Sequence, residues 1–235
     1  RQRQMCIRDR TYSMSGIGMV YLEQKQLDSA LEYHLKALKI AEEIGAENRI
    51  IYSRKFLGIT YRALGKPFAA LKENKLALQL AKKLDNEYAQ CGLVANIASI
   101  YIDHTDSLEV AKEYIKAGLE IAEKSNDKRL LKTLYSNMGS VYLREGNDEK
   151  FIAFKLKAME AAGETQDIWN RFTALQAIGR AYARLEQYHD ARLYLMEATK
   201  LAEENDIKQS LDVCYYWLAT ADSALGNYTA SYGSI

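Results

Sequence analysis

The stretch LGITYRALGKPFAALKENKLALQLA, residues 57–81, contains the pattern that decides the fold. It opens with an apolar residue and a small one, Leu57 and Gly58, and Tyr61 follows three residues after the glycine. Self-similarity at a fixed period of 20–50 residues indicates a repeat architecture. The apolar–small pair returns at steps of 40, 40, 41, 40 and 40 residues, at Ile17-Gly18, Leu57-Gly58, Ile97-Ala98, Met138-Gly139, Ile178-Gly179 and Leu218-Ala219.

The other positions of the repeat recur in the same register. The tyrosine is present in five copies, at Tyr21, Tyr61, Tyr101, Tyr142 and Tyr182, and the sixth copy has Asp222 instead. Small residues, with one phenylalanine, then follow at Ala30, Ala70, Ala111, Phe151 and Ala191, at Ala37, Ala77, Gly118, Ala158 and Ala198, and at Ala41, Ala81, Ala122, Ala162 and Ala202.

Each recurring position has a physical role in a pair of helices, here called helix A and helix B of a copy. The small residue allows helix A to approach helix B closely, and the tyrosine one turn later fills the remaining gap with its ring. The alanines at i, i+7 and i+11 share one stripe of helix B, where neighbouring helices come near. Gly65, Gly146 and Gly226 lie between the helices and suit left-handed helix ends.

Further local signals indicate where helices begin. Pro67, which is the only proline, falls at the start of a helix B, where proline is tolerated. Asp106 and Glu109 have capping-box spacing. The predicted helices span residues 11–24, 27–44, 48–64, 67–84, 87–103, 107–124, 128–145, 148–162, 168–185, 188–204 and 208–225.

The skeleton of an apolar–small pair, tyrosine and spaced alanines resembles the tetratricopeptide repeat over residues 11–235. The resemblance implies an all-α, right-handed superhelical solenoid of about five and a half helix-turn-helix repeats. The period of 40 exceeds the 34 residues usual for the family, and the usual proline near the end of helix B is missing. This longer variant is similar to arrays in bacterial signalling regulators, in peptide-sensing transcription factors and in cargo-binding adaptors.

The ten-residue leader RQRQMCIRDR lacks the repeat pattern, and we expect it to be non-native or disordered. Residues 11–235 are then predicted to form a single solenoid domain, truncated in its sixth repeat, where residues 228–235 would begin a helix B. Because solenoid ends need polar capping elements, we expect the native protein to continue past Ile235 and before Thr11.

Composition argues against several classes of function. The net charge of +1 gives no global field to attract nucleic acid or an anionic membrane. No apolar run is long enough to span a bilayer, and Cys6, Cys91 and Cys214 are too far apart for a metal motif, so a cytoplasmic protein with reduced thiols is expected. No nucleophile–base pair or phosphate loop is apparent, so we predict neither an enzyme nor a cofactor or metal site.

The predicted binding surface is the concave face, which the family lines with helix A. Basic residues outnumber acidic ones five to two at the expected inward positions. Two interpretations stay open, namely a groove for an acidic or C-terminal carboxylate segment, and an ordinary solvated helix face. The residues expected to contact a peptide are Lys55, Arg62, Asn96, Ser99, Asn137, Ser140, Arg144, Gln176, Arg180 and Arg184.

The two asparagines of this set directly precede the apolar position in adjacent repeats. The resemblance implies that Asn96 and Asn137 contact the main chain of a bound peptide, since an amide offers both a donor and an acceptor. The alternative is that each asparagine bonds across neighbouring A helices.

Two functional hypotheses follow. The first is a scaffold that binds a protein or an extended peptide. The second is a sensory or regulatory segment of a larger signalling protein, such as a transcription regulator or a sensor kinase, whose effector domain lies outside this chain. The identity of the partner and the oligomeric state are left open.

Overall fold

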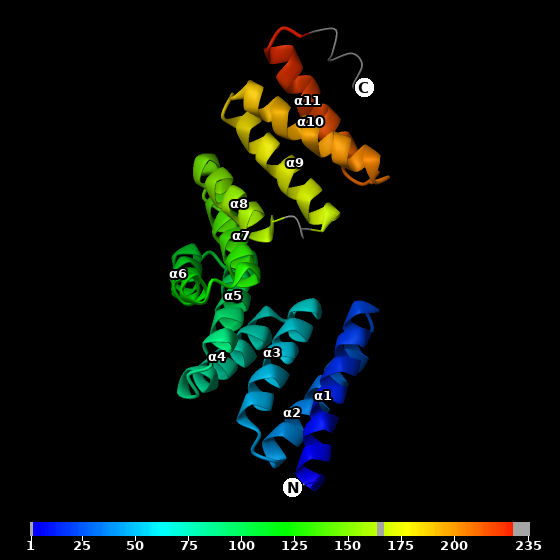
Figure 1. Ribbon diagram of the computed structural model, residues 1–235, viewed down its shortest axis with the longest axis vertical. Helices are drawn as coiled ribbons and strands as arrows, with labels where there is room; N and C mark the ends of the chain where they lie inside the picture. The colour runs from blue at the N-terminus through cyan, green and yellow to red at the C-terminus, as the bar shows by residue number, and fades with distance from the viewer. Residues whose placement is uncertain (1, 164–166, 228–235) are drawn as a thin grey trace. The chain divides into compact units, whose positions relative to one another are not determined.

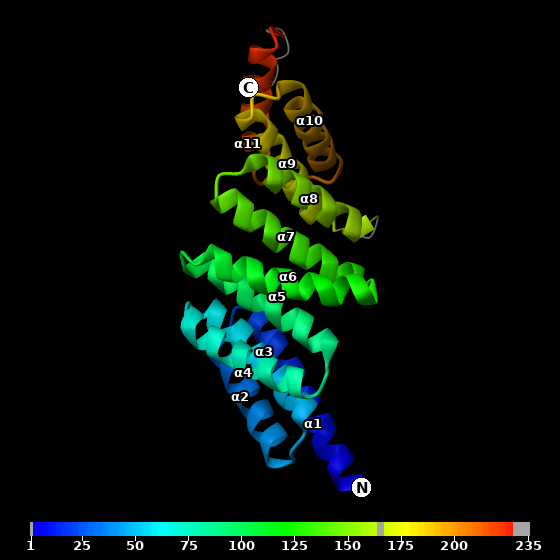
Figure 2. The same ribbon diagram turned by 90° about the vertical axis from the view of Figure 1, so that its left-hand side faces the viewer.

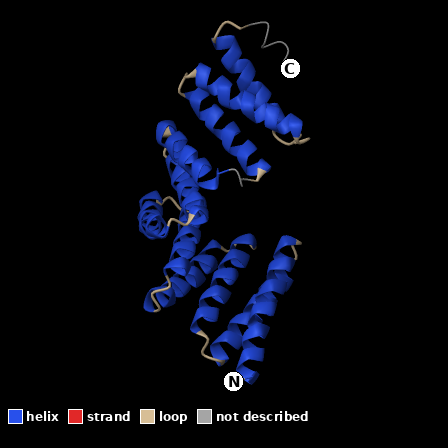
Figure 3. Cartoon of the chain, viewed as in Figure 1, coloured by secondary structure: helices blue, strands red, loops and turns tan. Residues whose placement is uncertain are grey.

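The computed structural model describes residues 2–163 and 167–227, with side chains from residue 10 onward. The described residues contain eleven α-helices and no strand (Figure 3). They divide into two compact units, residues 1–126 and 127–235, which are described separately below. The prediction of one continuous solenoid therefore stays a prediction, whereas the all-α fold of helical hairpins is confirmed.

The first unit consists of three helical hairpins in which each B helix packs against its own A helix (Figure 1). Successive A helices also pack on each other, α1 against α3 and α3 against α5. The helices are α1 (Gln2–Glu23), α2 (Leu27–Glu43), α3 (Glu47–Ala63), α4 (Pro67–Lys83), α5 (Glu87–His104) and α6 (Leu108–Ser125).

The second unit repeats this arrangement with two hairpins and a further A helix (Figure 2). In this unit α9 packs against α11 as well as against α10. The helices are α7 (Lys128–Arg144), α8 (Asp148–Ala162), α9 (Ile168–Arg184), α10 (Tyr188–Glu204) and α11 (Leu211–Ala224).

The hairpin turns have the predicted left-handed residues. Gly65, Gly146 and Gly226 have φ of 69°, 72° and 75°, and at Gly65 the chain closes with Lys66 N donating to Tyr61 O at 2.8 Å. Such a bond satisfies a carbonyl that the helix end would otherwise leave unpaired. Pro67 is confirmed as the first residue of α4.

Three boundary predictions differ from the structure. The first helix begins at Gln2 rather than at residue 11, because the leader is rich in arginine and glutamine, which favour helix; its non-native origin stays a prediction. Ser107 rather than Asp106 precedes α6 and makes no side-chain cap, so the capping box is wrong. The last helix begins at Leu211 rather than at 208, because Ser210 before it has φ 64°.

The predicted repeat positions form the core. Ala30, Ala70, Ala111 and Ala191 are fully buried, and Phe151 is nearly so. Each tyrosine is half-buried, and four of them pair with an aromatic ring of the same hairpin's B helix, with ring centroids 5.3–6.0 Å apart. Such pairs add to the burial of area alone. These are Tyr21–Tyr33, Tyr101–Tyr114, Tyr142–Phe154 and Tyr182–Tyr194.

The sixth copy replaces this aromatic contact by an ion pair. Asp222 stands in the tyrosine position and is 4% exposed. Arg192 of α10 donates from Nε to Asp222 Oδ1 at 2.7 Å. The guanidinium of Arg192 on α10 therefore compensates the charge of the buried Asp222 carboxylate on α11.

The residues that face each small position differ in chemistry from one hairpin to the next. A Cβ added to Gly58 would lie 2.3 Å from Asn74 Nδ2, and one added to Gly179 would lie 2.6 Å from Leu195 Cγ. In the first hairpin His34 takes this place, and Nδ1 lies 2.8 Å from Thr60 Oγ1 of the next hairpin while Nε2 lies 3.3 Å from Ser15 O. The glycine is thus required for close approach at Gly18, Gly58 and Gly179, as predicted from the repeat, whereas a Cβ added to Gly139 would make only ordinary contacts, at 3.7 Å or more.

Candidate functional site

Four of the predicted peptide-binding residues lie on the neighbouring helices α3 and α5. Lys55 of α3 reaches across to α5, where a Cβ added to Gly92 would lie 3.2 Å from its Nζ. Burial lowers the pKa of the Lys55 ammonium, and no ion pair or hydrogen bond with a described residue offsets that burial. An anionic ligand group placed beside this desolvated cation would compensate its charge, so binding of such a group is favoured.

Asn96 lies one turn after Gly92 on the same face of α5. Its Nδ2 is buried and has no hydrogen-bond partner. The expected alternative, a bond from Asn96 across neighbouring A helices, is therefore not made by this donor. An unsatisfied buried amide is costly, so a ligand acceptor at this point would be favoured.

Arg62 and Ser99 are joined to each other. Arg62 Nη1 donates to Ser99 Oγ at 2.9 Å, and Ser99 Oγ donates to Asp103 Oδ2 at 3.3 Å. This chain of polar contacts links α3 to α5 and partly neutralises the guanidinium. These two residues are thus held in place on the same surface as Lys55 and Asn96.

In the second unit, the predicted residues of α9 contact other helices. Gln176 is 9% exposed, and its Nε2 donates to Ser210 O at 2.7 Å and lies 3.3 Å from Cys214 Sγ. Arg180 lies over the Trp217 ring at 6.0 Å, with its Nε buried and without a hydrogen-bond partner. Both side chains therefore connect α9 to α11.

Arg184 also has a protein partner. Its Nε donates to Asp148 Oδ2 at 2.8 Å, and its Nη2 donates to the other oxygen of the same carboxylate. This two-pronged bond to the start of α8 raises the pKa of Arg184. The guanidinium is thus matched by an internal acid.

The remaining predicted residues lie along α7. Ser140 Oγ donates to Ser136 O at 3.1 Å, the preceding turn of the same helix. Asn137 is half-buried and Arg144 is exposed, and each has an interaction partner within the protein.

A cavity of about 370 Å³ lies between α1 and α3. Its walls include Met19, Tyr52 and Phe56, and at its rim Arg49 lies over the Tyr12 ring at 5.3 Å. The mostly apolar lining suits a hydrophobic side chain of a ligand. Sequence reasoning missed this cavity, because most of its lining lies outside the positions expected to face inward.

A second, polar cavity of about 80 Å³ lies among α7, α8 and α9. Lys132, Ser136 and Lys155 belong to its lining. Lys155 was not predicted, since its position is a core position where the neighbouring repeats have Ile115 and Leu195. The signal that could have revealed it is a lysine at a repeat position that is apolar and buried in the neighbouring copies.

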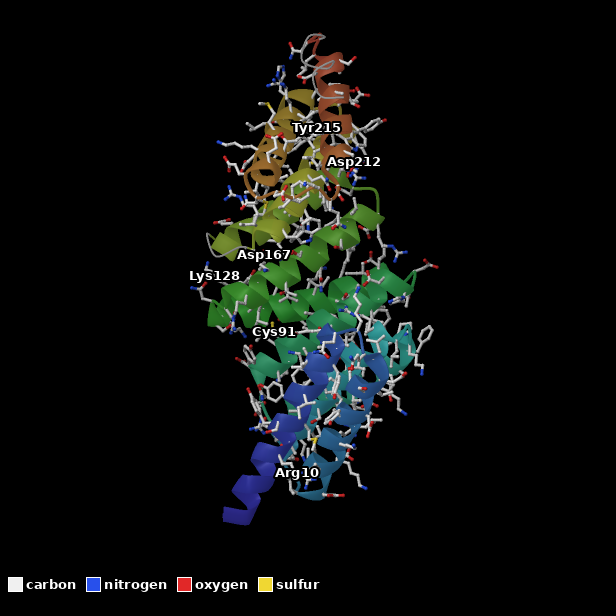
Figure 4. The ribbon with its side chains drawn as sticks, turned by 90° about the vertical axis from the view of Figure 1, so that its right-hand side faces the viewer. Arg10, Cys91, Lys128, Asp167, Asp212 and Tyr215 are labelled. Carbon is white, nitrogen blue, oxygen red and sulfur yellow. The ribbon has the colours of Figure 1, made fainter. Side chains whose placement is uncertain are left out.

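The residues that could carry other chemistry are packed into the core. His34 is fully buried, and burial lowers its pKa although the Ser15 carbonyl opposes this shift. Cys91 and Cys214 are buried thiols on α5 and α11; Figure 4 labels Cys91. Cys6 lies outside the residues whose side chains are described. Among the described side chains, no group of three His, Cys, Asp or Glu residues could hold a metal ion.

No helix in the described part of the chain is both long and apolar enough to cross a membrane.

Stacked hairpins with close small-residue contacts define a helical-repeat protein. Two tetratricopeptide repeat models match residues 9–83 and 172–205. These two segments of the chain are therefore tetratricopeptide repeats. No curated protein matches the chain significantly.

Solved structures with the same fold include proteins described as sensors. The chain is similar to a Signal Transduction ATPase with Numerous Domains from Pyrococcus horikoshii that has a tetratricopeptide repeat sensor, with 20% identity and a TM-score of 0.72 over 95% of this chain. The chain spans only 34% of that protein's length.

Two further similar structures cover most of both chains. The apo form of the quorum sensor NprR from B. thuringiensis has 17% identity and a TM-score of 0.68, covering 97% of this chain and 75% of that one. A Rap protein complexed with competence and sporulation factor has 14% identity and a TM-score of 0.68, covering 96% and 72%. At these identities the likeness shows the fold alone.

Proposed function

We propose that the chain is a protein- or peptide-binding scaffold that docks an extended segment on its A helices, without catalysing a reaction. The observation that carries the proposal is the buried Asn96 Nδ2, which has no hydrogen-bond partner on a surface expected to bind main chain. Asn96 is half-buried, and rotation of its side chain toward the surface would let a carbonyl of an extended peptide satisfy this donor.

Lys55 supports an acidic partner at the same place. Gly92 and Asn96 are one turn apart on α5, and Lys55 Nζ lies next to Gly92, so the ammonium and the amide serve one stretch of surface. A carboxylate beside Lys55 would compensate a cation that the protein leaves without a counter-ion. Arg62 is already bonded to Ser99 and would contribute mainly by orienting the surface.

The proposal also agrees with what is known of similar folds. A Rap protein is recorded in complex with competence and sporulation factor, and NprR is a quorum sensor. We extend a binding role of this kind to the present chain only as part of the proposal.

The test uses the whole chain and peptides selected from a randomised display library. Asn96→Ala is expected to weaken binding of the selected peptides by about tenfold, because a hydrogen bond to a buried amide is worth roughly 1–1.5 kcal/mol. Asn205→Ala is the matched control, since this exposed asparagine bonds only within its own helix end, to Leu201 O. Equal affinities of all three proteins, with far-ultraviolet circular dichroism unchanged, would refute the assignment of this surface.

A second candidate is a sensory segment of a larger signalling protein. The observation that favours it is the similarity to a protein with a tetratricopeptide repeat sensor, of which this chain spans 34%. The flanking genomic sequence decides the question. An adjoining DNA-binding, kinase or ATPase domain in the same reading frame would support a sensory role, and a complete gene without one would exclude it.

A further inference from the structure

The polar cavity of the second unit has an unusual set of donors. It is lined by Lys132, Ser136, Lys155, Ala158, Met159, Asn170, Thr173 and Ala174, and we call it the lysine pocket. Its volume is about 80 Å³, against roughly 30 Å³ for one water in the liquid. The pocket therefore accommodates a group of a few heavy atoms and not a large ligand.

The helices leave room for this pocket because α7 and α9 are not packed directly together. Their Cα atoms do not approach within 8 Å, whereas those of α9 and α11 do. Lys155 of α8 lines the pocket and occupies the repeat position that faces Gly139. Gly139 and Lys155 thus take the places that Gly179 and Leu195 occupy in the next hairpin.

Neither lysine of the pocket is paired with an acid among the described residues. Lys132 and Lys155 are half-buried, and neither ammonium forms an ion pair or hydrogen bond with a residue whose side chain the structure describes. Burial lowers the pKa of Lys155, with no neighbouring charge to oppose the shift. Two ammonium groups that line one small cavity favour an anion between them.

The neighbouring polar groups are already partly used. Asn170 Nδ2 donates to Asp167 Oδ2 at 3.1 Å, and Thr173 Oγ1 donates to Asn170 O at 3.1 Å. Asp167, labelled at the start of α9 in Figure 4, also accepts from Trp169 N at 3.4 Å. The hydroxyl of Ser136 has no such contact with a described residue, so it is available as a third donor beside the two lysines.

We propose that the lysine pocket binds the side-chain carboxylate of an Asp or Glu residue in the partner peptide, held by Lys132, Lys155 and the Ser136 hydroxyl. The inference rests on the proposed function and specifies the chemistry of the partner at one point. Ser136 lies three residues before Gly139, one of the positions predicted to face inward, so a peptide on the A helices would pass over the pocket mouth. A carboxylate fits because it is planar, singly charged and only three heavy atoms in size.

The first experiment tests the pocket without any partner. The whole chain is labelled with ¹³C-lysine and titrated with Nα-acetyl-glutamate amide and, separately, with Nα-acetyl-glutamine amide at equal ionic strength. The Lys155 ε-methylene resonance, assigned with Lys155→Met, is expected to move with the glutamate compound only. Equal responses to both compounds, or a larger response to inorganic phosphate, would overturn the proposal.

The second experiment separates the pocket from the general binding role. Peptides selected from the display library are compared with their Glu→Gln or Asp→Asn counterparts on three proteins: the unaltered chain, Lys155→Met and the control Lys157→Met. Lys157 lies on the same helix but is exposed, over the Phe154 and Tyr135 rings. Lys155→Met should lose at least about tenfold in affinity for the acidic peptide and little for its neutral counterpart, since a charged hydrogen-bonded pair is being removed.

The outcomes distinguish the two proposals. Two results would overturn the lysine pocket but not the scaffold. The first is that the selected peptides bind without needing an acidic residue, and the second is that Lys155→Met lowers the affinity for acidic and neutral peptides equally. Failure of all peptides to bind, together with a glutamate-specific shift of Lys155, would overturn the peptide scaffold and leave the pocket as a carboxylate site.

Discussion

Gly58→Ala should destabilise the first unit although alanine favours helix over glycine. Gly58 lies inside α3, where the propensity gain alone would stabilise by about 1 kcal/mol. The new Cβ would lie 2.3 Å from Asn74 Nδ2, 2.9 Å from Cγ and 3.0 Å from Oδ1. Asn74 is 1% exposed and its Nδ2 donates to Ala70 O at 2.9 Å, so the amide cannot retreat without losing this bond.

The two opposing effects set the expected size. Overpacking costs about 1–3 kcal/mol, and a buried amide that loses its partner costs about 1–3 kcal/mol more. After the propensity gain of about 1 kcal/mol, the net loss should be about 1–5 kcal/mol. Urea unfolding followed by circular dichroism at 222 nm measures this as a lower midpoint for the transition of the first unit.

Matched variants make the test specific. Gly16→Ala, at a glycine that is also inside a helix (α1) but has no atom within 4 Å of the added Cβ, should stabilise by up to about 1 kcal/mol. Asn74→Ala in the Gly58→Ala background should recover much of the loss, because the clashing amide is gone. If Gly58→Ala raised the midpoint as Gly16→Ala does, the close approach of α3 and α4 would be wrong.

Three further predictions concern buried polar groups. His34 has a folded pKa below its usual 6.5, so the unfolded chain binds more protons and stability falls as pH drops from about 6.5 toward the folded value, by at most about 1.4 kcal/mol per unit; urea midpoints at pH 7.5 and 5.5 should differ less in His34→Phe. Cys91 and Cys214 should react with a thiol reagent only in denaturant, since both are fully buried and burial raises the pKa of Cys214; rapid native-state labelling of either, located by mass spectrometry, would contradict the packing. Arg192→Met should destabilise the second unit by about 2–3 kcal/mol in urea unfolding, because it leaves the Asp222 carboxylate buried alone, and adding Asp222→Asn should restore part of the loss.

The repeat pattern predicted the helices because their signals are local. Gly65 and Pro67 mark one turn so strongly that α4 begins at the predicted residue. The ends of several other helices rest on non-glycine residues in the left-handed region, such as Lys25 and Glu186, for which no local residue preference exists. Those ends are fixed by hydrogen bonds back to the preceding helix, for example Gln26 N to Tyr21 O at 2.9 Å.

The candidate site was less predictable because its chemistry depends on contacts between helices. Gln176 was expected to face a ligand, but its contact with Cys214 requires the packing of α9 on α11. Lys155 was not predicted because the repeat pattern assigns its position to the apolar core. Asn96 was chosen on the strength of the family resemblance, and whether it binds peptide stays a prediction.

The imidazole of His34 means that these hairpins are not interchangeable building blocks. Its Nδ1 meets the Thr60 hydroxyl, which belongs to the following hairpin, and the equivalent residue one hairpin later is Ile100. An engineer who excised α3 and α4 and spliced α2 onto α5 would set a buried imidazole against a hydrocarbon side chain, with one ring nitrogen stranded. The buried contacts between hairpins therefore depend on the order of the hairpins. Deletion or duplication of one hairpin would require a compensating substitution at the contact of His34 with Thr60.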